Sequence, residues 1–147
     1  MYTQYVDMHS DMVVSQFSGQ PMYLQIMDQV KQKIAVGDWA SGEEIPSIRQ
    51  LAVALRVSVI TVKRAYLELE REGVIVTHHG KGSFVAPDPA LSPRLYEEQF
   101  AEHLERAAQL GASLGMSDRE MVSRLRKALD QVDEAKGNDT KLAKETL

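Results

Sequence analysis

The side chains that could do chemistry in this sequence are cations and hydroxyls spread over residues 47–85. Lys63 and Arg64 lie near the start of an expected helix, Arg49 lies near the start of the helix before it, and Lys81 lies in a glycine-rich loop after both. Lysine and arginine pair with phosphate oxygens and donate hydrogen bonds to base edges. The pattern predicts charge pairing and base-edge recognition, and not catalysis.

Two short helices are expected to position these cations. Ser47–Gln50 fits a capping box, and apolar residues then recur at helical spacing as far as Leu55. Ser58 is suited to cap a second helix from about Val59 to Glu72, and Gly73 is suited to end it in a left-handed conformation. Two helices joined by three residues, with the second polar on its outer face, are typical of a helix-turn-helix.

A β-hairpin is expected directly after the second helix. Residues 74–77 are β-branched, residues 83–85 can pair with them, and residues 78–82 (HHGKG) supply two glycines for the turn. A hairpin with a basic tip in this place is a wing. His78 and His79 could instead bind a metal, but neighbouring residues of a strand point to opposite faces, so no metal site is predicted.

An upstream helix is expected to begin near Pro21 and to end at Gly37, packing across the back of the helix-turn-helix. Trp39 is expected in the core, and residues 44–46 are expected to add a short edge strand to the wing. Residues 12–14 are apolar, so they either form a short strand or simply pack.

After a proline-rich linker, two further helices are expected. Ser92 and Pro93 are suited to begin the first of them, which Gly115 ends, and Ser117 begins a capping box for the second, which fades near Lys136. Residues spaced by three and four form an apolar stripe: Tyr96, Phe100, Leu104, Ala107, Gly111 and Leu114 on the first helix, and Val122, Leu125 and Leu129 on the second.

This stripe needs a partner, because two helices cannot bury a core by themselves. It could fold back onto the first domain, or it could pair with a second copy of the chain. We expect the second arrangement, with the small residues Ala107 and Gly111 allowing another helix to approach closely.

Composition sets further limits. The net charge is −4, but residues 46–86 carry six Lys or Arg against three Glu, a charge of +3, and residues 88–147 carry nine against twelve acidic residues, a charge of −3. There is no cysteine and no apolar run near twenty residues. We expect a cytoplasmic protein without a membrane anchor and without a cofactor. No catalytic arrangement is present, so an enzyme is not expected.

The stretch from Pro46 to Val85 resembles the winged helix-turn-helix domain of the GntR family of bacterial transcription factors. The match includes the Pro-Ser pair at 46–47, the Val-Ser pair at 57–58, the segment 61–66 (TVKRAY) and the closing segment 80–85 (GKGSFV). The short two-helix tail is similar to that of the YtrA-like subfamily, and the resemblance implies a homodimer.

These observations predict a mainly α (α+β) protein, a winged helix-turn-helix DNA-binding domain followed by a two-helix dimerisation region. The expected segments are 1–18 (N-terminal segment), 19–87 (DNA-binding domain), 88–93 (linker), 94–136 (dimerisation and possible effector region) and 137–147 (flexible tail). The expected partners are double-stranded DNA and a second copy, with a small-molecule effector left open.

The expected activity is regulation of transcription, by repression at an inverted-repeat operator. The residues expected to contact DNA are Arg49, Ser58, Thr61, Lys63, Arg64, His79, Gly80 and Lys81. A direct contact by Arg64 competes with a bracing pair to Glu68, four residues on. Two other functions stay open: a protein-interaction module that does not bind DNA, and a regulator gated by a metal or a ligand.

Overall fold

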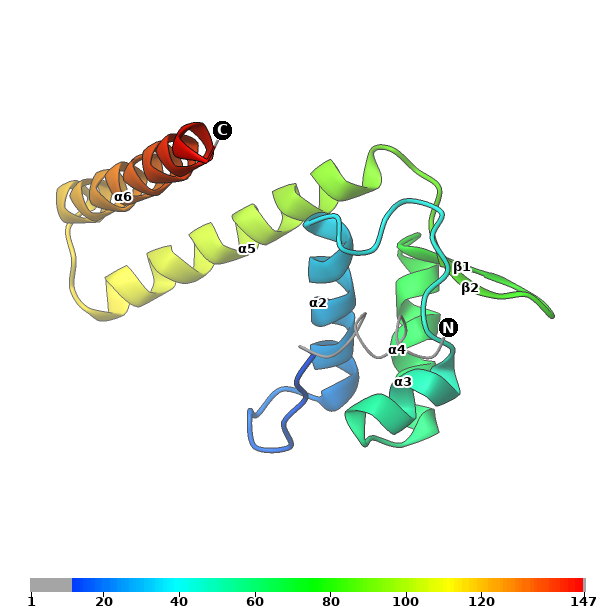
Figure 1. Cartoon of the computed structure of the whole chain (residues 1–147). Helices are drawn as coiled ribbons and strands as arrows, with labels where there is room; N and C mark the ends of the chain where they lie inside the picture. The colour runs from blue at the N-terminus through cyan, green and yellow to red at the C-terminus, as the bar shows by residue number, and fades with distance from the viewer. Residues whose placement is uncertain (1–11, 147) are drawn as a thin grey trace. The chain divides into compact units, whose positions relative to one another are not determined.

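A computed structural model describes residues 12–146, so residues 1–11 of the expected N-terminal segment lie outside it (Figure 1). The elements in chain order are α2 (Met22–Ala35), α3 (Ile48–Leu55), α4 (Val59–Arg71), β1 (Ile75–His78), β2 (Gly82–Val85), α5 (Leu91–Ser113) and α6 (Asp118–Glu145). This architecture confirms the mainly α winged-helix class. The chain divides into two compact units between Glu98 and Gln99.

The two helices of the helix-turn-helix begin at the predicted caps. Ser47 Oγ accepts the Gln50 N–H at 3.1 Å and Gln50 Oε1 accepts the Ser47 N–H at 2.9 Å, so the capping box is complete. Ser58 Oγ accepts the Thr61 N–H at 3.2 Å and begins α4. Each cap satisfies backbone donors that a helix leaves unpaired in its first turn.

The end of α4 directs the chain into the wing. Gly73 has φ of +75°, its N–H donates to Glu70 O at 3.0 Å, and the Val74 N–H donates to Leu69 O at 2.9 Å. These two bonds form a Schellman motif, in which a left-handed glycine lets the last carbonyls find donors. Leu69 and Val74 are both fully buried, so the motif also anchors the start of the hairpin in the core.

The wing is a two-stranded antiparallel sheet whose register runs from Ile75 opposite Val85 to His78 opposite Gly82. The edge strand expected over residues 44–46 is a single bridge, between Glu44 and Phe84. Its two backbone bonds join the Ile45 N–H to Ser83 O at 2.9 Å and the Val85 N–H to Glu43 O at 2.8 Å. The next residue that could extend the ladder is Ser47, which is already the cap of α3 and donates its N–H to Gln50.

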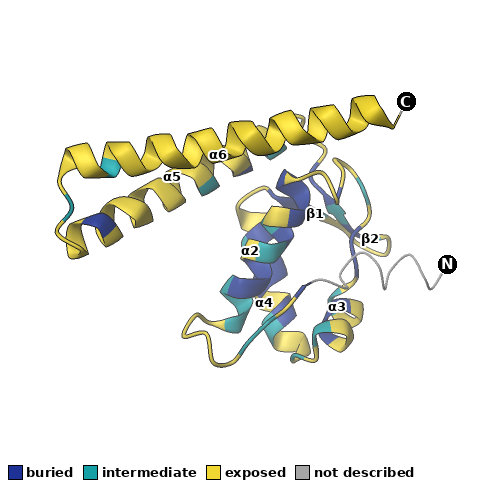
Figure 2. Ribbon diagram, turned by 60° about the vertical axis from the view of Figure 1, so that its left-hand side comes forward, coloured by how far each residue is buried: buried dark blue, intermediate teal, exposed yellow. Residues whose placement is uncertain are grey.

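The core of the first unit lies where α4 packs against α2, α3 and β1 (Figure 2). Trp39 is 1% exposed, which confirms its predicted position as a core anchor. The largest of the other fully buried side chains are Ile26, Ile45, Leu51, Leu69, Ile75, Leu91 and Leu95.

The prediction for the start of α5 was wrong. The helix begins at Leu91, inside the expected linker, and Ser92 is not its cap, since Ser92 Oγ donates to Ala35 O at 2.9 Å. Pro93 is therefore the third helical residue, where a missing N–H has no consequence because that donor would be unpaired anyway. Leu91 and Leu95 are buried, so the first turns of α5 belong to the core of the first unit.

The prediction for the end of α6 was also wrong. The helix continues to Glu145, through the residues expected to form a flexible tail. Gly137 lies inside it at a cost of about 1 kcal/mol relative to alanine. Its lysine, alanine and glutamate neighbours favour helix, no proline follows, and Thr140 Oγ1 donates to Lys136 O at 2.9 Å.

Residues 12–20 form a loop that is tied to α2 by a buried glutamine. Gln25 Nε2 donates to Ser15 O and to Gln20 O, both at 2.8 Å, and Gln25 Oε1 accepts the Ser15 N–H at 2.9 Å. Met12 packs into the core. Of the two alternatives for residues 12–14, packing is the one that the structure shows.

Candidate DNA interface

The outward face of α4 carries the two predicted cations in different surroundings. Lys63 is exposed. Arg64 is also exposed, but its guanidinium carbon lies 3.9 Å from the ring centre of Tyr23 on α2, a cation–π contact. The alternative pairing of Arg64 with Glu68 is not the one that the structure shows, since Glu68 pairs with Arg71 at 3.0 Å.

The first turn of α4 holds the two predicted hydroxyls. Ser58 Oγ and Thr61 Oγ1 lie 2.8 Å apart, in addition to the bond from the Thr61 N–H to Ser58 Oγ. Both hydroxyls are therefore engaged with each other at the cap. Their neighbours Val59 and Ile60 are exposed.

Arg49 lies in the first turn of α3 and is exposed. It is separated from α4 by a turn in which Arg56 has φ of +55°, the only non-glycine residue with positive φ within residues 12–146. Arg56 keeps this conformation because its N–H donates to Val53 O at 3.3 Å and the Val57 N–H donates to Ala52 O at 3.1 Å. In the sequence Arg56 adds to the positive charge of residues 46–86, but no local pattern indicates its left-handed backbone.

The tip of the wing contains the remaining predicted residues. His79, Gly80 and Lys81 are exposed, Gly80 has φ of +77°, and the Lys81 N–H donates to His78 O at 2.9 Å to close the turn. The His78 ring contacts Phe84, with ring centres 5.4 Å apart. His79 and Lys81 therefore extend the tip, while His78 packs along the hairpin.

A buried tyrosine braces the helix-turn-helix from behind. The Tyr66 hydroxyl, on the inner face of α4, donates to Pro46 O at 2.6 Å, just before the cap of α3. Burial raises the pKa of this phenol well above its usual range, because the phenolate would lose its hydration. The sequence placed Tyr66 on the inner stripe of its helix, but no local pattern indicated its acceptor.

In the second unit the predicted apolar stripe is largely exposed in the single chain (Figure 2). Phe100 is 63% exposed and Leu125 is 51% exposed. The exposed fractions of four other stripe residues lie between 48% and 72%: Leu104, Leu114, Val122 and Leu129. Tyr96, at the end of the first unit, is 48% exposed.

Gly111 differs from the rest of the stripe. It is buried, and a Cβ at this position would lie only 2.0 Å from Met121 Sδ on α6. The small residue therefore makes room for a helix of the same chain, at the turn that Gly115 and Ser117 form. The expectation that another helix approaches closely at Gly111 fits this contact, and the part of Gly111 in dimerisation stays a prediction.

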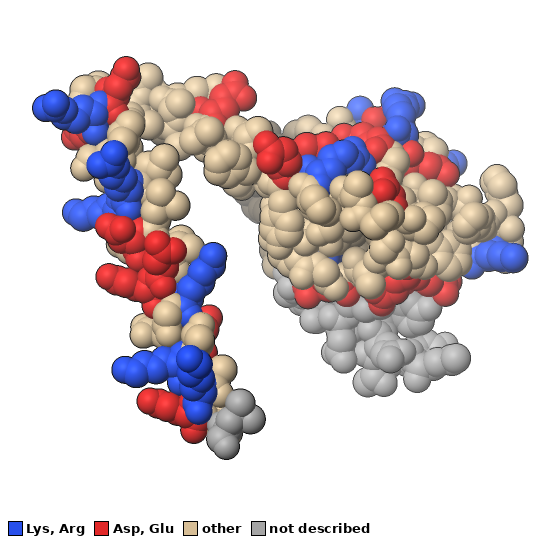
Figure 3. Space-filling model, turned by 90° about the horizontal axis from the view of Figure 1, so that it is seen from above, with Lys and Arg blue, Asp and Glu red and all other residues tan. Residues whose placement is uncertain are grey.

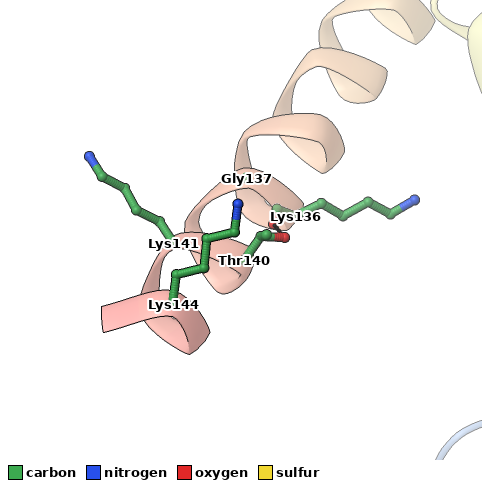
Figure 4. A pocket seen from close by; sticks show the side chains of 5 residues that line it. All are labelled: Lys136, Gly137, Thr140, Lys141 and Lys144. Carbon is green, nitrogen blue, oxygen red and sulfur yellow. Dashed lines mark hydrogen bonds between the residues drawn. The ribbon is translucent and has the colours of Figure 1, made fainter. Parts of the chain in front are cut away.

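The surface of the second unit is charged along its length and carries shallow hollows on α6. Figure 3 shows Lys and Arg alternating with Asp and Glu along it. A shallow hollow on α6 is lined by Lys136, Gly137, Thr140, Lys141 and Lys144, whose lysine side chains splay apart (Figure 4). Because one helix supplies the whole lining, this hollow has no opposite wall to hold a ligand.

Within residues 12–146, no three His, Asp or Glu side chains gather in a way that could hold a metal ion. In the same range no helix combines the length and the apolar character needed to span a membrane.

Comparison with known proteins adds to this geometry. Residues 22–85 match the family described as "Bacterial regulatory proteins, gntR family". The chain is 32% identical over 105 residues to the uncharacterized HTH-type transcriptional regulator YhcF of Bacillus subtilis (strain 168), which covers 71% of this chain and 87% of that protein. This similarity is longer than the segment 22–85, so it includes residues outside the winged helix.

Two further similarities point the same way. The HTH-type transcriptional repressor YtrA of Bacillus subtilis (strain 168) is 41% identical over 69 residues, 47% of this chain and 53% of that protein. A solved structure, a GntR family transcriptional regulator from Listeria monocytogenes, superposes with a TM-score of 0.69 at 27% identity, covering 75% of this chain and 96% of that chain.

Proposed function

The chain belongs to the GntR family of bacterial regulatory proteins, and from this premise we propose that it represses transcription as a homodimer on an inverted-repeat operator. It is a transcriptional regulator with a winged helix-turn-helix DNA-binding domain. The observation that carries the proposal is the exposure of Arg49, Lys63 and Lys81 on three elements of one compact unit. The relative YtrA is described as a transcriptional repressor, which supports the direction of regulation.

In the proposed complex α4 enters the major groove. Its 13 residues rise about 1.5 Å each, so it is about 20 Å long. A helix is about 10–12 Å across with its side chains, which fits a major groove about 12 Å wide. Lys63 pairs with phosphates, and Arg49 meets the backbone beside them. Ser58 and Thr61 approach phosphates from the first turn, and Arg64 stays over Tyr23 while its exposed edge faces the backbone.

The wing enters the flanking minor groove. Gly80 has no side chain and lets the backbone of the tip come close, and Lys81 adds a positive charge where the minor groove is most negative. His79 lies beside them at the tip and adds a second donor. The neutralised phosphates supply most of the affinity, so binding should fall steeply with salt.

Dimerisation follows from the exposed apolar stripe of α5 and α6. A second copy that covers Phe100, Leu104 and Leu125 would remove them from water, at about 25 cal/mol per Å² of apolar surface. A two-fold dimer presents two α4 helices, so its half-sites should lie about one helical turn, or 34 Å, apart in opposite orientation.

The test is a gel shift with the DNA upstream of the protein's own gene, followed by footprinting and a reporter assay. We expect a specific complex with a two-fold symmetric footprint, and higher reporter expression when the protein is absent. Binding of unrelated DNA with equal affinity, or no binding at low salt, would contradict the proposal and favour a protein-interaction module. Activation of the reporter would leave DNA binding intact but overturn repression.

A further inference from the structure

The first turn of α4 exposes two aliphatic side chains at the place where the helix would meet base edges. Ile60 is 79% exposed and Val59 is 46% exposed. Lys63 is four residues from Val59 and three from Ile60, so all three share the outward face of the helix. This face is open to solvent at Ile60 and Lys63 and in part at Val59. Exposed aliphatic side chains beside a cation suit a partner that is anionic overall and apolar in places.

The polar groups of the same turn are partly engaged with each other. The Ser58 and Thr61 hydroxyls lie 2.8 Å apart and Ser58 Oγ also accepts the Thr61 N–H. One hydroxyl proton is used between the two oxygens, so the pair keeps one proton and two lone pairs, which can meet a phosphate beside the turn. The exposed side chains of Val59 and Ile60 offer hydrocarbon to a base edge, beside the ammonium group of Lys63.

In the major groove one base-edge feature matches hydrocarbon, the C5 methyl group of thymine. An isoleucine placed against a cytosine amino group or a guanine carbonyl would exclude water from it and leave it without a partner, which is unfavourable. An aliphatic first turn therefore selects for thymine and against G·C pairs at the positions it covers.

We propose that Val59 and Ile60 recognise thymine methyl groups in each half-site of the operator. This inference rests on the proposed function, and it names the chemistry by which α4 selects its sequence. The surrounding cations hold the helix in the groove for any sequence, and the two aliphatic side chains decide which T·A pairs are accepted.

The experiment replaces thymine by deoxyuridine, one position at a time, in the operator found by footprinting. This change removes the methyl group and keeps every hydrogen-bonding group of the base pair. Loss of one buried methyl is worth about 0.8 kcal/mol, or about a fourfold weaker Kd for each thymine. We expect this loss at one or two adjacent positions of each half-site, and no loss at other thymines.

The protein side of the test uses exposed positions, so folding should be unaffected, and thermal melting checks this. Ile60→Ala and Val59→Ala should each abolish the deoxyuridine penalty at one position. Val36→Ala is the matched control, because Val36 is also 46% exposed but lies at the end of α2. It should keep the full penalty.

Two results would overturn the inference while the proposed function stands: specific binding that no deoxyuridine substitution weakens, or a penalty that persists unchanged in both alanine variants. Absence of specific DNA binding by the unaltered protein would instead overturn the proposed function, and this inference with it.

Discussion

The residues of the first unit fall into two groups. Some side chains are exposed and can contact DNA, and others are engaged in contacts within the domain. Lys63 belongs to the first group, since it is exposed on the outward face of α4. Arg64 is held over Tyr23, and Tyr66 is bonded to Pro46. A substitution of a free residue should change binding, while a substitution of a held residue should also change the stability of the domain.

Lys63→Ala should weaken binding to all sequences by a similar factor, because the lost contact is to phosphate. The slope of log K against log salt should flatten by about 0.9 for each subunit that loses one phosphate contact. Titrations at several salt concentrations measure both effects. Arg71→Ala is the control, since Arg71 lies at the opposite end of α4 and pairs with Glu68. An unchanged slope would remove Lys63 from the interface.

Arg56→Gly should stabilise the first unit. A left-handed conformation costs a non-glycine residue about 1–2 kcal/mol, and part of this gain is offset by the greater freedom of glycine in the unfolded chain. The expected net gain is about 0.5–1 kcal/mol in urea unfolding. Arg56→Ala keeps the strained φ and should change stability little. If the two variants change stability equally, the effect comes from loss of the charge and not from relief of backbone strain.

Tyr66→Phe should destabilise the domain by about 1–2 kcal/mol at neutral pH, because the Pro46 carbonyl would lose its donor in a buried place. The pH dependence has a definite sign. Burial raises the pKa of Tyr66 above the value of about 10 in the unfolded chain, so its contribution is complete below pH 10 and is lost as pH rises further.

Titration of Tyr66 alone can lower the free energy of unfolding by at most about 1.4 kcal/mol for each unit of pH. Urea midpoints at pH 7 and above pH 10 measure it. Tyr66→Phe should lose stability less steeply above pH 10 than the unaltered protein, and parallel curves would contradict the assignment.

At the scale of elements, the sequence predicted most helix ends that depend on a local capping residue or on a glycine. Ser47, Ser58 and Gly73 act within four residues of the chain, and each was found where the pattern placed it. The boundaries that failed depend on distant partners. Ser92 looks like a cap in sequence, but it bonds to Ala35, 57 residues away, and no local rule can distinguish these two uses.

In the candidate site, too, local features were predicted from the sequence and contacts between distant residues were not. The sequence identified the exposed cations, because solvent-facing positions follow from helical spacing. It left open whether Arg64 contacts DNA or pairs with Glu68, and the structure adds a third partner, Tyr23, on a helix 41 residues earlier in the chain. Likewise, Met121 approaches Gly111 because of the geometry of the turn between α5 and α6. The spacing of apolar residues along each helix does not predict that geometry.

A pair of glycine substitutions tests the elements directly. Gly73→Ala should destabilise the first unit by about 1–2 kcal/mol, because φ is +75° and the cost comes from the backbone alone, with no atom within 4 Å of the added Cβ. Gly137→Ala also meets open space but lies inside α6, so it should increase helix stability by about 1 kcal/mol. Circular dichroism during urea unfolding measures both, and effects of the same sign would contradict the assigned conformations.

At the scale of the whole molecule, one unit carries the proposed DNA contacts and the other carries an apolar stripe without a core of its own. Among the described residues of the second unit, Gly111 is the only one that is buried. Helix α6 contributes no buried residue to this set. Two helices in this state gain little from each other, so their stability should depend on a partner and therefore on protein concentration.

Leu125→Asp together with Leu129→Asp should convert the protein into a monomer, because each carboxylate would have to lose its hydration in the proposed interface. Sedimentation at micromolar concentration should then give the mass of one chain. Operator affinity should fall by about 10²-fold or more, since the second half-site is no longer bound as part of the same complex. Affinity for a single half-site should stay the same, because the residues of α4 and the wing are unaltered.

The control places a new charge on α6 outside the stripe. Ser123 is exposed on α6 and lies about a third of a turn from the middle of the stripe, so Ser123→Asp should leave both mass and operator affinity unchanged. A double variant that stays dimeric would move the interface elsewhere. A monomer that keeps full operator affinity would show that the two half-sites are bound independently, and the symmetric operator would then reflect two separate sites and not one paired protein.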